Sequence, residues 1–212
     1  MNDVLLVMNP RQIPECMEPL SDLPIQRIHL QGFTEAALAS EGFPQALAYD
    51  FDWYWVMSDD IIVRPQALEA VRTVRDLGHP VVTGYSQRSH TDWRVNLTRQ
   101  PLMAGSPGIA AYDFRTFAEI VSWPDRSVPT WFAGFSLTGM SREMWLRFPF
   151  ETFGDPGWAS DFSLSQRLGL AGVPIMAARE GFAYHWRHND LYGEDPRDEQ
   201  TDFTKGKAVV LV

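Results

Sequence analysis

The sequence has one cysteine, no long apolar run and few basic residues. Because Cys16 is the only cysteine in 212 residues, an internal disulfide and a cysteine-rich zinc site are both excluded. No stretch approaches the run of about eighteen apolar residues that a membrane-spanning helix needs. The first residues also lack the basic start and apolar stretch of a secretory signal, so we expect the chain to be located in a reducing cytoplasm.

Positive charge is scarce as well. The chain has 18 Lys and Arg against 27 Asp and Glu, which gives a formal net charge of -9. A general nucleic-acid binder needs a basic surface to hold the phosphate backbone, so the composition disfavours that class. Arg88, Arg94 and Arg99 are close together in the sequence and could form a local basic patch.

Aromatic residues, in contrast, are abundant. They make up 13% of the sequence, with 8 Trp, and they gather around turn and loop signals. Rings at loops suit a protein that binds a polar ligand by stacking, although Trp side chains also fill cores. The length suits a single domain with one sizeable hydrophobic core.

Strand and helix patterns alternate through the first part of the chain. Four apolar or alternating stretches are typical of strands, namely residues 3–9, 24–30, 52–58 and 80–86. Between them, residues 33–42 and 64–78 predict helices; Thr34 fits the start of the first helix and Gly42 its end. The alternation predicts an α/β fold with a mostly parallel central sheet flanked by helices.

The pattern changes in the second part. Residues 87–130 mix short alternating pieces with turn signals, which predicts shorter strands and loops. Residues 131–145 predict a strand that runs into a helix capped by Ser141. Residues 158–172 predict another helix, with Ser160 as its N-cap.

Ser58, Asp59 and Asp60 raise a question, because they directly follow an apolar strand and precede two isoleucines. Carboxylates are rarely buried unless they are paired or bind a metal. One interpretation is a turn whose acids cap the segment that follows. The other is a ligand site, because open α/β sheets bind ligands beyond the carboxyl ends of their strands.

The order of these segments resembles that of GT-A glycosyltransferases, in particular the family-2-like enzymes of the nucleotide-diphospho-sugar transferase superfamily. The resemblance is carried by the acid pair after the third strand and by three later segments, "FAGFSLTGMSREMW", "WASDFSLSQRLGLAGVPI" and "YHWRH". It implies one GT-A domain over residues 1–188, followed by a C-terminal tail over residues 189–212. A nucleotide-sugar half would span about residues 1–86 and an acceptor half about residues 87–188.

The resemblance implies metal-dependent transfer of a sugar, with inversion, from a nucleotide-diphospho-sugar to an acceptor hydroxyl. Asp60 then holds Mn²⁺ or Mg²⁺ on the diphosphate, because such cations prefer oxygen ligands and keep positions open for phosphate and water. The metal offsets the charge that builds on the departing diphosphate. His185 or His188 would complete the metal shell, and an imidazole ligand suits Mn²⁺ better than Mg²⁺.

A second acid is implied as the general base. In the family, an acid at the start of the acceptor-facing helix takes the proton of the attacking hydroxyl, and Asp161 stands at that place. Asp155 is the reserve candidate. A structural interpretation competes, because an acid in the first turn also suits the helix dipole.

The resemblance also implies contacts with both substrates. The residues expected to bind the donor are Asn9, Pro10, Arg11, Gln31, Ser58, Asp59, Gly134 and Arg187. The residues expected to bind the acceptor are Trp131, Phe132 and Trp158. The nucleotide base stays open, because Gln31 stands near the place of the acid that usually follows the second strand.

Other functions stay open. Ser58 stands where many relatives carry the first acid of an Asp-x-Asp motif, which leaves room for a non-catalytic GT-A-like module that binds sugars or nucleotides. The acceptor could be a glycan, a small molecule or a modified base of phage DNA. A nucleotidyltransferase is disfavoured, because no glycine-rich phosphate loop follows the first strand.

Overall fold

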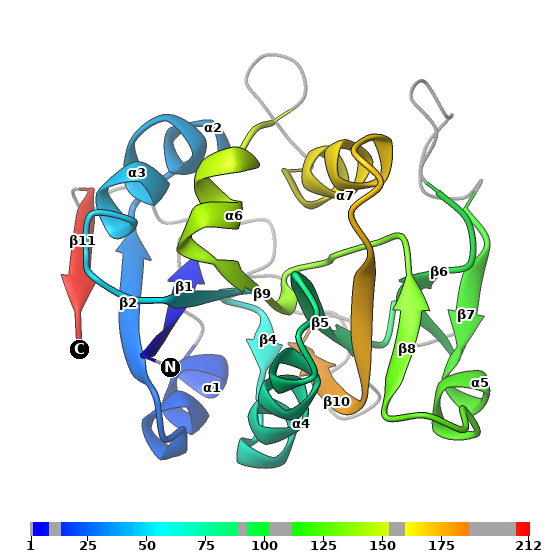
Figure 1. Ribbon diagram of the computed structural model, residues 1–212. Helices are drawn as coiled ribbons and strands as arrows, with labels where there is room; N and C mark the ends of the chain where they lie inside the picture. The colour runs from blue at the N-terminus through cyan, green and yellow to red at the C-terminus, as the bar shows by residue number, and fades with distance from the viewer. Residues whose placement is uncertain (1, 9–13, 89–92, 102–111, 153–159, 187–206) are drawn as a thin grey trace.

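The protein is built on one twisted sheet of nine strands (Figure 1). The computed structural model describes residues 2–8, 14–88, 93–101, 112–152, 160–186 and 207–212. Five strands run in the same direction: β1 (Asp3–Met8), β2 (Gln26–Gln31), β3 (Trp53–Ser58), β5 (Val81–Ser86) and β10 (Ile175–His185). Four run the opposite way: β4 (Ile61–Ile62), β8 (Ser127–Thr130), β9 (Ser136–Ser141) and β11 (Ala208–Leu211). The predicted α/β fold with a mostly parallel sheet is therefore confirmed.

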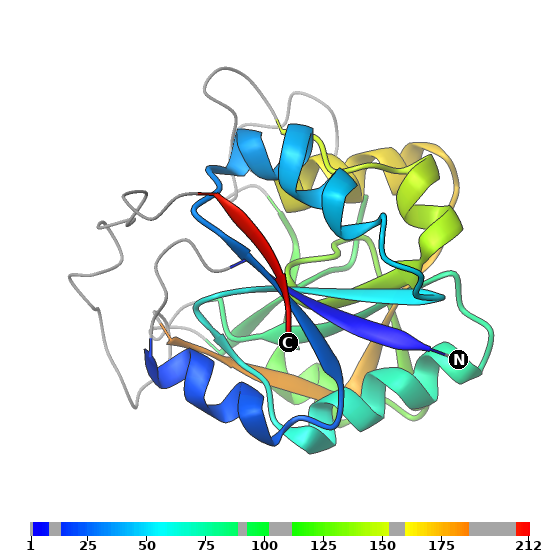
Figure 2. The same ribbon diagram turned by 90° about the vertical axis from the view of Figure 1, so that its left-hand side faces the viewer.

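The spatial order of the strands is β11-β2-β1-β3-β9-β5-β10-β4, and β8 pairs with β10. Helices cover both faces of this sheet (Figures 1 and 2). One face carries α1 (Pro14–Met17), η1 (Glu18–Asp22) and α4 (Pro65–Asp76). The other carries α2 (Glu35–Ala37), η2 (Leu38–Gly42), α3 (Phe43–Ala46), α6 (Arg142–Arg147) and α7 (Ser160–Leu170).

Two covered faces explain why β1 is a continuous apolar run. Val4 and Leu6 are fully buried in the core on the α3 and α7 side, whereas Leu5 and Val7 are fully buried in the core on the α4 side. A strand with a core on each side needs apolar side chains at consecutive positions rather than at alternate ones. None of the helices in the described ranges is long and apolar enough to cross a membrane.

A small lobe extends from one side of the sheet. It contains the two-stranded ribbon of β6 (Arg94–Thr98) and β7 (Phe114–Thr116), followed by α5 (Phe117–Val121). The lobe has a separate hydrophobic cluster that includes Tyr85, Val95, Leu97, Ile120 and Val128. The shorter strands predicted for this part of the chain are confirmed.

The first predicted helix begins as expected but does not end at Gly42. Thr34 is its N-cap, and its hydroxyl accepts a hydrogen bond from the Ala37 N–H at 3.2 Å. The helical path then continues through η2, a single π-helical turn, into α3. Gly42 keeps a helical backbone, and a Cβ there would lie 3.3 Å from the Phe33 ring. The glycine therefore permits close packing against Phe33 instead of ending the helix.

The caps of the two later helices differ in their outcome. Ser141 caps α6 as predicted, and its hydroxyl accepts from the Met144 N–H at 3.2 Å. The N-cap prediction for Ser160 is wrong, because Ser160 already has a helical backbone and belongs to α7. The Ser160 hydroxyl donates to the carboxylate of Glu35 in α2.

The end of the chain, which the sequence suggested was a separate tail, contributes a strand to the sheet. β11 pairs antiparallel with β2, and Val212 and Arg27 exchange two further backbone hydrogen bonds. Lys207 donates to Glu41 of η2 at 2.7 Å. The last residues are therefore an edge strand of the main sheet.

Candidate functional site

The strand order points to the edge where β1 and β3 end as the place where a ligand would bind. From β1 the chain passes to β2 on one side, and then crosses back to β3 on the other side of β1. In open α/β sheets such a reversal leaves a crevice beyond the carboxyl ends of the two strands. Met8 and Ser58 are paired at this edge, and Asp59 and Asp60 come directly after Ser58.

The turn after β3 brings Asp60 to the end of β10. The short strand β4 runs back along β10, with Ile61 opposite His185. The Trp186 N–H donates to the Asp60 carbonyl at 2.7 Å, which fixes the two backbones side by side. As a result, the Asp60 Oδ2 and His185 Nε2 atoms lie 3.0 Å apart, although the residues are 125 positions apart in the sequence.

The burial of these acids is unusual for a surface turn. Asp59 is 0% exposed and Asp60 is 7% exposed. Acids at such depth need partners that compensate for the lost water. Asp59 and Asp60 do stand in a turn, as one interpretation of the sequence had it, but this turn is buried.

The Asp60–His185 pair fits part of a divalent metal shell. Two ligands at right angles around an octahedral ion, with bonds of about 2.1 Å, stand about 3 Å apart. The carboxylate oxygen and the imidazole nitrogen show this separation, which is equally that of the direct hydrogen bond between the two side chains. Within the described ranges, no group of three or more His, Cys, Asp or Glu residues gathers around one point. The remaining positions of a shell would therefore fall to phosphate oxygens, water or residues outside those ranges.

A polar network that the sequence did not reveal lies next to this edge. The Ser86 and Ser136 hydroxyls are 2.7 Å apart, and the Asn96 side chain bonds both the Ser136 hydroxyl and the Ser86 N–H. A Cβ on Gly134 would lie 2.5 Å from Asn96 Nδ2, so only glycine leaves room for this amide. Gly134 therefore makes room for Asn96, and its expected contact with the donor stays a prediction.

A bulge in β9 aims Ser136 at this network. The β3–β9 register shifts between Val56 and Met57, so that Leu137 is skipped in the pairing. Leu137 has a φ of 100°, which is a strained conformation for a residue with a branched side chain. Bulges of this kind redirect side chains and are frequent beside functional sites. No local sequence signal marks this position.

Asp161 lies in the first turn of α7, on the other face of the sheet from α4. Its Oδ1 accepts from the Phe162 N–H at 2.8 Å. Burial raises the pKa of Asp161 to about 7, the Phe162 hydrogen bond opposes that rise, and the charge of Glu35 adds to it. A carboxyl group with a pKa near neutrality can both take and release a proton under physiological conditions.

The other predicted contacts fall into two groups. Among the described residues, Gln31 ends β2 opposite Ala208, and Trp131 lies against Gly169 of α7. Phe132 is 4% exposed and packs on Phe162, with ring centroids 4.9 Å apart. The contacts predicted for these side chains with donor and acceptor stay predictions. The remaining predicted residues lie outside the described ranges: Asn9, Pro10, Arg11, Asp155, Trp158, Arg187 and His188.

Two of the three arginines in the possible basic patch, Arg88 and Arg99, make contacts within the small lobe. Arg99 forms ion pairs with Asp113 and Glu119. The Arg88 guanidinium lies over the Phe114 ring, 4.4 Å from its centroid. Their charge is therefore partly neutralised or engaged within the lobe, and this gives no support to a phosphate-backbone partner.

No protein-family model matches this sequence, and no curated protein matches it either. Solved structures do match by fold. The crystal structure of A197 from STIV aligns with a TM-score of 0.55 and 16% identity, over 88% of this chain and 86% of that chain. A crystal structure of GalNAc-T7 with UDP, GalNAc and Mn²⁺ aligns with a TM-score of 0.52 and 9% identity.

The GalNAc-T7 alignment covers different shares of the two chains. The GalNAc-T7 alignment spans 92% of this chain but 45% of that one, so this chain is about half as long. An inositol-1-phosphate CTP transferase from T. maritima aligns over 98% of both chains, with 10% identity and a TM-score of 0.47. At these identities the likeness concerns the fold, which is GT-A-like as the sequence predicted.

Proposed function

We propose that this chain, whose fold is that of the GT-A glycosyltransferases, moves a sugar from a nucleotide-diphospho-sugar to an acceptor hydroxyl. The observation that carries the proposal is the meeting of Asp60 and His185 at the carboxyl edge of the sheet. This edge is where the strand order calls for a ligand. A carboxylate and an imidazole are both ligands of Mn²⁺ or Mg²⁺. Their presence at this edge fits a binding site for a diphosphate and its cation.

In this proposal Asp60 and His185 are the residues that would hold a divalent cation. Such a cation would supply positive charge that offsets the charge of the leaving diphosphate. Asp59 and Ser58, at the end of β3, are the side chains proposed to contact the sugar and ribose. The burial of Asp59 and Asp60 would strengthen these contacts, because electrostatic interactions are stronger in a site from which water is excluded.

Asp161 is the proposed general base. Its carboxylate takes the proton from the acceptor hydroxyl while the oxygen attacks the anomeric carbon and the bond to the diphosphate breaks. One base on the acceptor side and direct displacement give inversion at the anomeric carbon. A pKa of about 7 leaves a substantial fraction of Asp161 deprotonated and ready to accept at neutral pH.

The donor site can be tested by ligand-induced stabilisation. The melting temperature would be measured with UDP-, GDP-, dTDP- and CMP-sugars, each with and without Mn²⁺, for wild type, Asp60→Asn and His185→Ala. A ligand that binds only the folded state raises the melting temperature as its free concentration exceeds its dissociation constant. We expect one nucleotide class to stabilise wild type in the presence of Mn²⁺, and both variants to lose that response.

Asp125→Asn is the matched control, because Asp125 lies exposed in the turn between α5 and β8. It makes the same chemical change far from the proposed site and should keep the full response. A response that survives in Asp60→Asn and His185→Ala would remove the metal from the proposal. The absence of any response in wild type would favour another function for the fold.

A module that binds sugar or nucleotide without turnover is the second candidate, and Ser58 in place of an acid is the feature that favours it. The two candidates separate at turnover. Once a donor is found, hydrolysis or transfer of its sugar by wild type, lost in Asp161→Asn, indicates an enzyme. Binding with metal but no cleavage of the donor, across a panel of glycans, small molecules and modified DNA, indicates the module.

A further inference from the structure

We propose that Glu35, on α2, is a positioning residue for Asp161. It anchors the first turn of α7 and places a second negative charge beside the base. The inference rests on the proposed role of Asp161 in the transfer reaction, and it concerns a residue to which the sequence assigned no role. The two halves of the chain meet at this point, since 125 positions separate the partners.

The first argument is the pair of hydrogen bonds that Glu35 accepts. Its Oε1 atom receives the Ser160 N–H at 2.7 Å and the Ser160 hydroxyl at 2.5 Å. The first N–H groups of a helix have no partner within the helix, so they must be satisfied from outside. Glu35 satisfies one of them from another helix, and it therefore fixes where α7 begins relative to α2.

Asp161 is held from its other side as well. Its backbone carbonyl accepts the Ser165 hydroxyl at 2.7 Å, and the Ser165 oxygen accepts the Ala133 N–H at 2.9 Å. The backbone on either side of the base is thus tied to α2 through Ser160 and to the segment before β9 through Ser165. A base that is fixed in this way loses little freedom when the acceptor binds.

The second argument is charge. Burial is the larger reason for the raised pKa of Asp161, and the negative charge of Glu35 adds to it. Arg167, the basic residue in the last turn of the same helix, bonds the Pro149 carbonyl and pairs with Glu151. The Arg167 guanidinium thus interacts with the segment after α6, whereas the charge that acts on Asp161 is the negative charge of Glu35.

The test compares Glu35→Gln with Glu35→Ala. Glutamine keeps an oxygen acceptor for Ser160 but removes the charge, whereas alanine removes both. Two readouts are taken for each protein: the titration of the Asp161 carboxyl carbon by NMR, and the pH dependence of kcat/KM for transfer. Glu69→Gln is the control, because Glu69 is exposed on α4, on the opposite face of the sheet.

For Glu35→Gln we expect the pKa of Asp161 to fall and the acid limb of the rate profile to follow it. At pH 6 the rate, relative to its plateau, should rise about two- to threefold. The plateau itself should stay near that of wild type. For Glu35→Ala the plateau should also fall by about tenfold or more, because the base is no longer held in place. Glu69→Gln should change neither readout.

The possible failures are distinguishable. If Asp161 titrates at the same pH in wild type and Glu35→Gln, the inference about Glu35 is overturned, while the proposed base is still judged by Asp161→Asn alone. If the titration moves and the rate profile does not, Asp161 is not the base. The proposed mechanism then fails, and a positioning role for Glu35 fails with it.

Discussion

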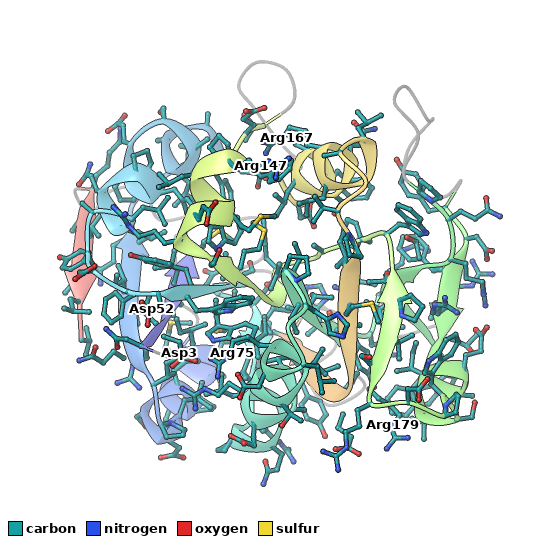
Figure 3. The ribbon with its side chains drawn as sticks, viewed as in Figure 1. Asp3, Asp52, Arg75, Arg147, Arg167 and Arg179 are labelled. Carbon is teal, nitrogen blue, oxygen red and sulfur yellow. The ribbon has the colours of Figure 1, made fainter. Side chains whose placement is uncertain are left out.

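The two ends of the sheet treat a partly buried aspartate in opposite ways. At the amino end, Asp3 bonds Arg72 and Arg75 of α4, both at 2.9 Å, and accepts from the Trp55 indole at 3.0 Å. Figure 3 labels Asp3 and Arg75. Burial alone would raise the pKa of Asp3, but these hydrogen bonds and charges lower it instead. At the other end, the pKa of Asp161 is raised to about 7 by burial and by the charge of Glu35.

The difference separates a structural acid from a candidate catalytic one. A carboxylate surrounded by cations is more stable as an anion in the folded state, so it contributes to stability at neutral pH. A carboxyl group with a raised pKa is less stable as an anion in the folded state than in the unfolded state. This lowers the stability of the fold at neutral pH and is typical of functional sites. Burial alone therefore says little about the role of an acid; the sign of its pKa shift says more.

The largest expected effect is on catalysis, from Asp161→Asn. Asparagine cannot take the proton of the acceptor, so the transfer rate should fall on the order of 10²- to 10⁴-fold. The melting temperature at pH 8 should not fall, because the substitution removes a carboxylate that is unfavourable in the folded state. Initial rates with the donor found by the binding screen, together with thermal melts, check both statements.

The second effect is on stability, from Asp3→Asn. The change leaves the guanidinium groups of Arg72 and Arg75 without their shared anion in a partly buried position, so we expect a loss of about 3 kcal/mol in the free energy of unfolding. Urea denaturation measures this loss. Transfer activity at low temperature should be retained, because Asp3 lies at the amino end of the strands.

Asp52→Asn is the control for this end of the sheet. Asp52 is exposed, and its Oδ2 accepts from the Asn2 N–H at 2.8 Å (Figure 3 labels both acids). An exposed hydrogen bond of this kind contributes about 1 kcal/mol or less. An equal loss in Asp52→Asn and Asp3→Asn would show that burial and the two arginines do not set Asp3 apart.

Much of the fold could be predicted from local pattern. The apolar runs of β1 and β3 reflect burial on both faces, and α4 shows its buried Leu68, Val71 and Val74 at helical spacing. Such patterns are local, because each residue reports the burial of its own position. The end of the first helix was predicted wrongly, because Gly42 is needed for close packing against the Phe33 ring and not for ending the helix. Local sequence rules do not include such a contact.

What could not be predicted depends on pairing between distant segments. The bulge at Leu137, the edge strand β11 and the bonds of Glu35 to Ser160 all arise from register or docking, which periodicity does not encode. The site shows the same division. The acids at the end of β3 were visible as a motif, and the resemblance implied that His185 or His188 joins them. The structure shows the contact of His185 with Asp60, whereas Asn96 and Ser136 carried no signal in the sequence.

The third effect is a pair of pH dependences with opposite sign. The folded pKa of Asp3 lies below its ordinary value of 3.8, so its contribution is present above that value and is lost as the pH falls through the folded pKa. The folded pKa of Asp161 lies above its ordinary value, so its unfavourable contribution develops as the pH rises from 3.8 to about 7. Asp3→Asn should therefore resemble wild type most closely in acid, and Asp161→Asn should gain stability over wild type only toward neutral pH. Urea unfolding at several pH values between 3 and 8 measures both differences, and parallel curves for the two variants would contradict the contrast.

The smallest effect concerns a pair that belongs to neither end, the Lys207–Glu41 contact that joins β11 to η2. Its side chains are 46% and 47% exposed, and exposed ion pairs contribute roughly 0.2–1 kcal/mol. Glu41→Gln should accordingly lower the free energy of unfolding by no more than about 1 kcal/mol, and 0.5 M salt should erase the difference because it screens the charges. Its value lies in the contrast with Asp3, whose arginines are far less exposed and whose loss should persist in the same salt. If Glu41→Gln destabilised the protein as strongly as Asp3→Asn, exposure would not govern the strength of these ion pairs. Burial would then not explain why the contacts of Asp3 with Arg72 and Arg75 stabilise the amino end.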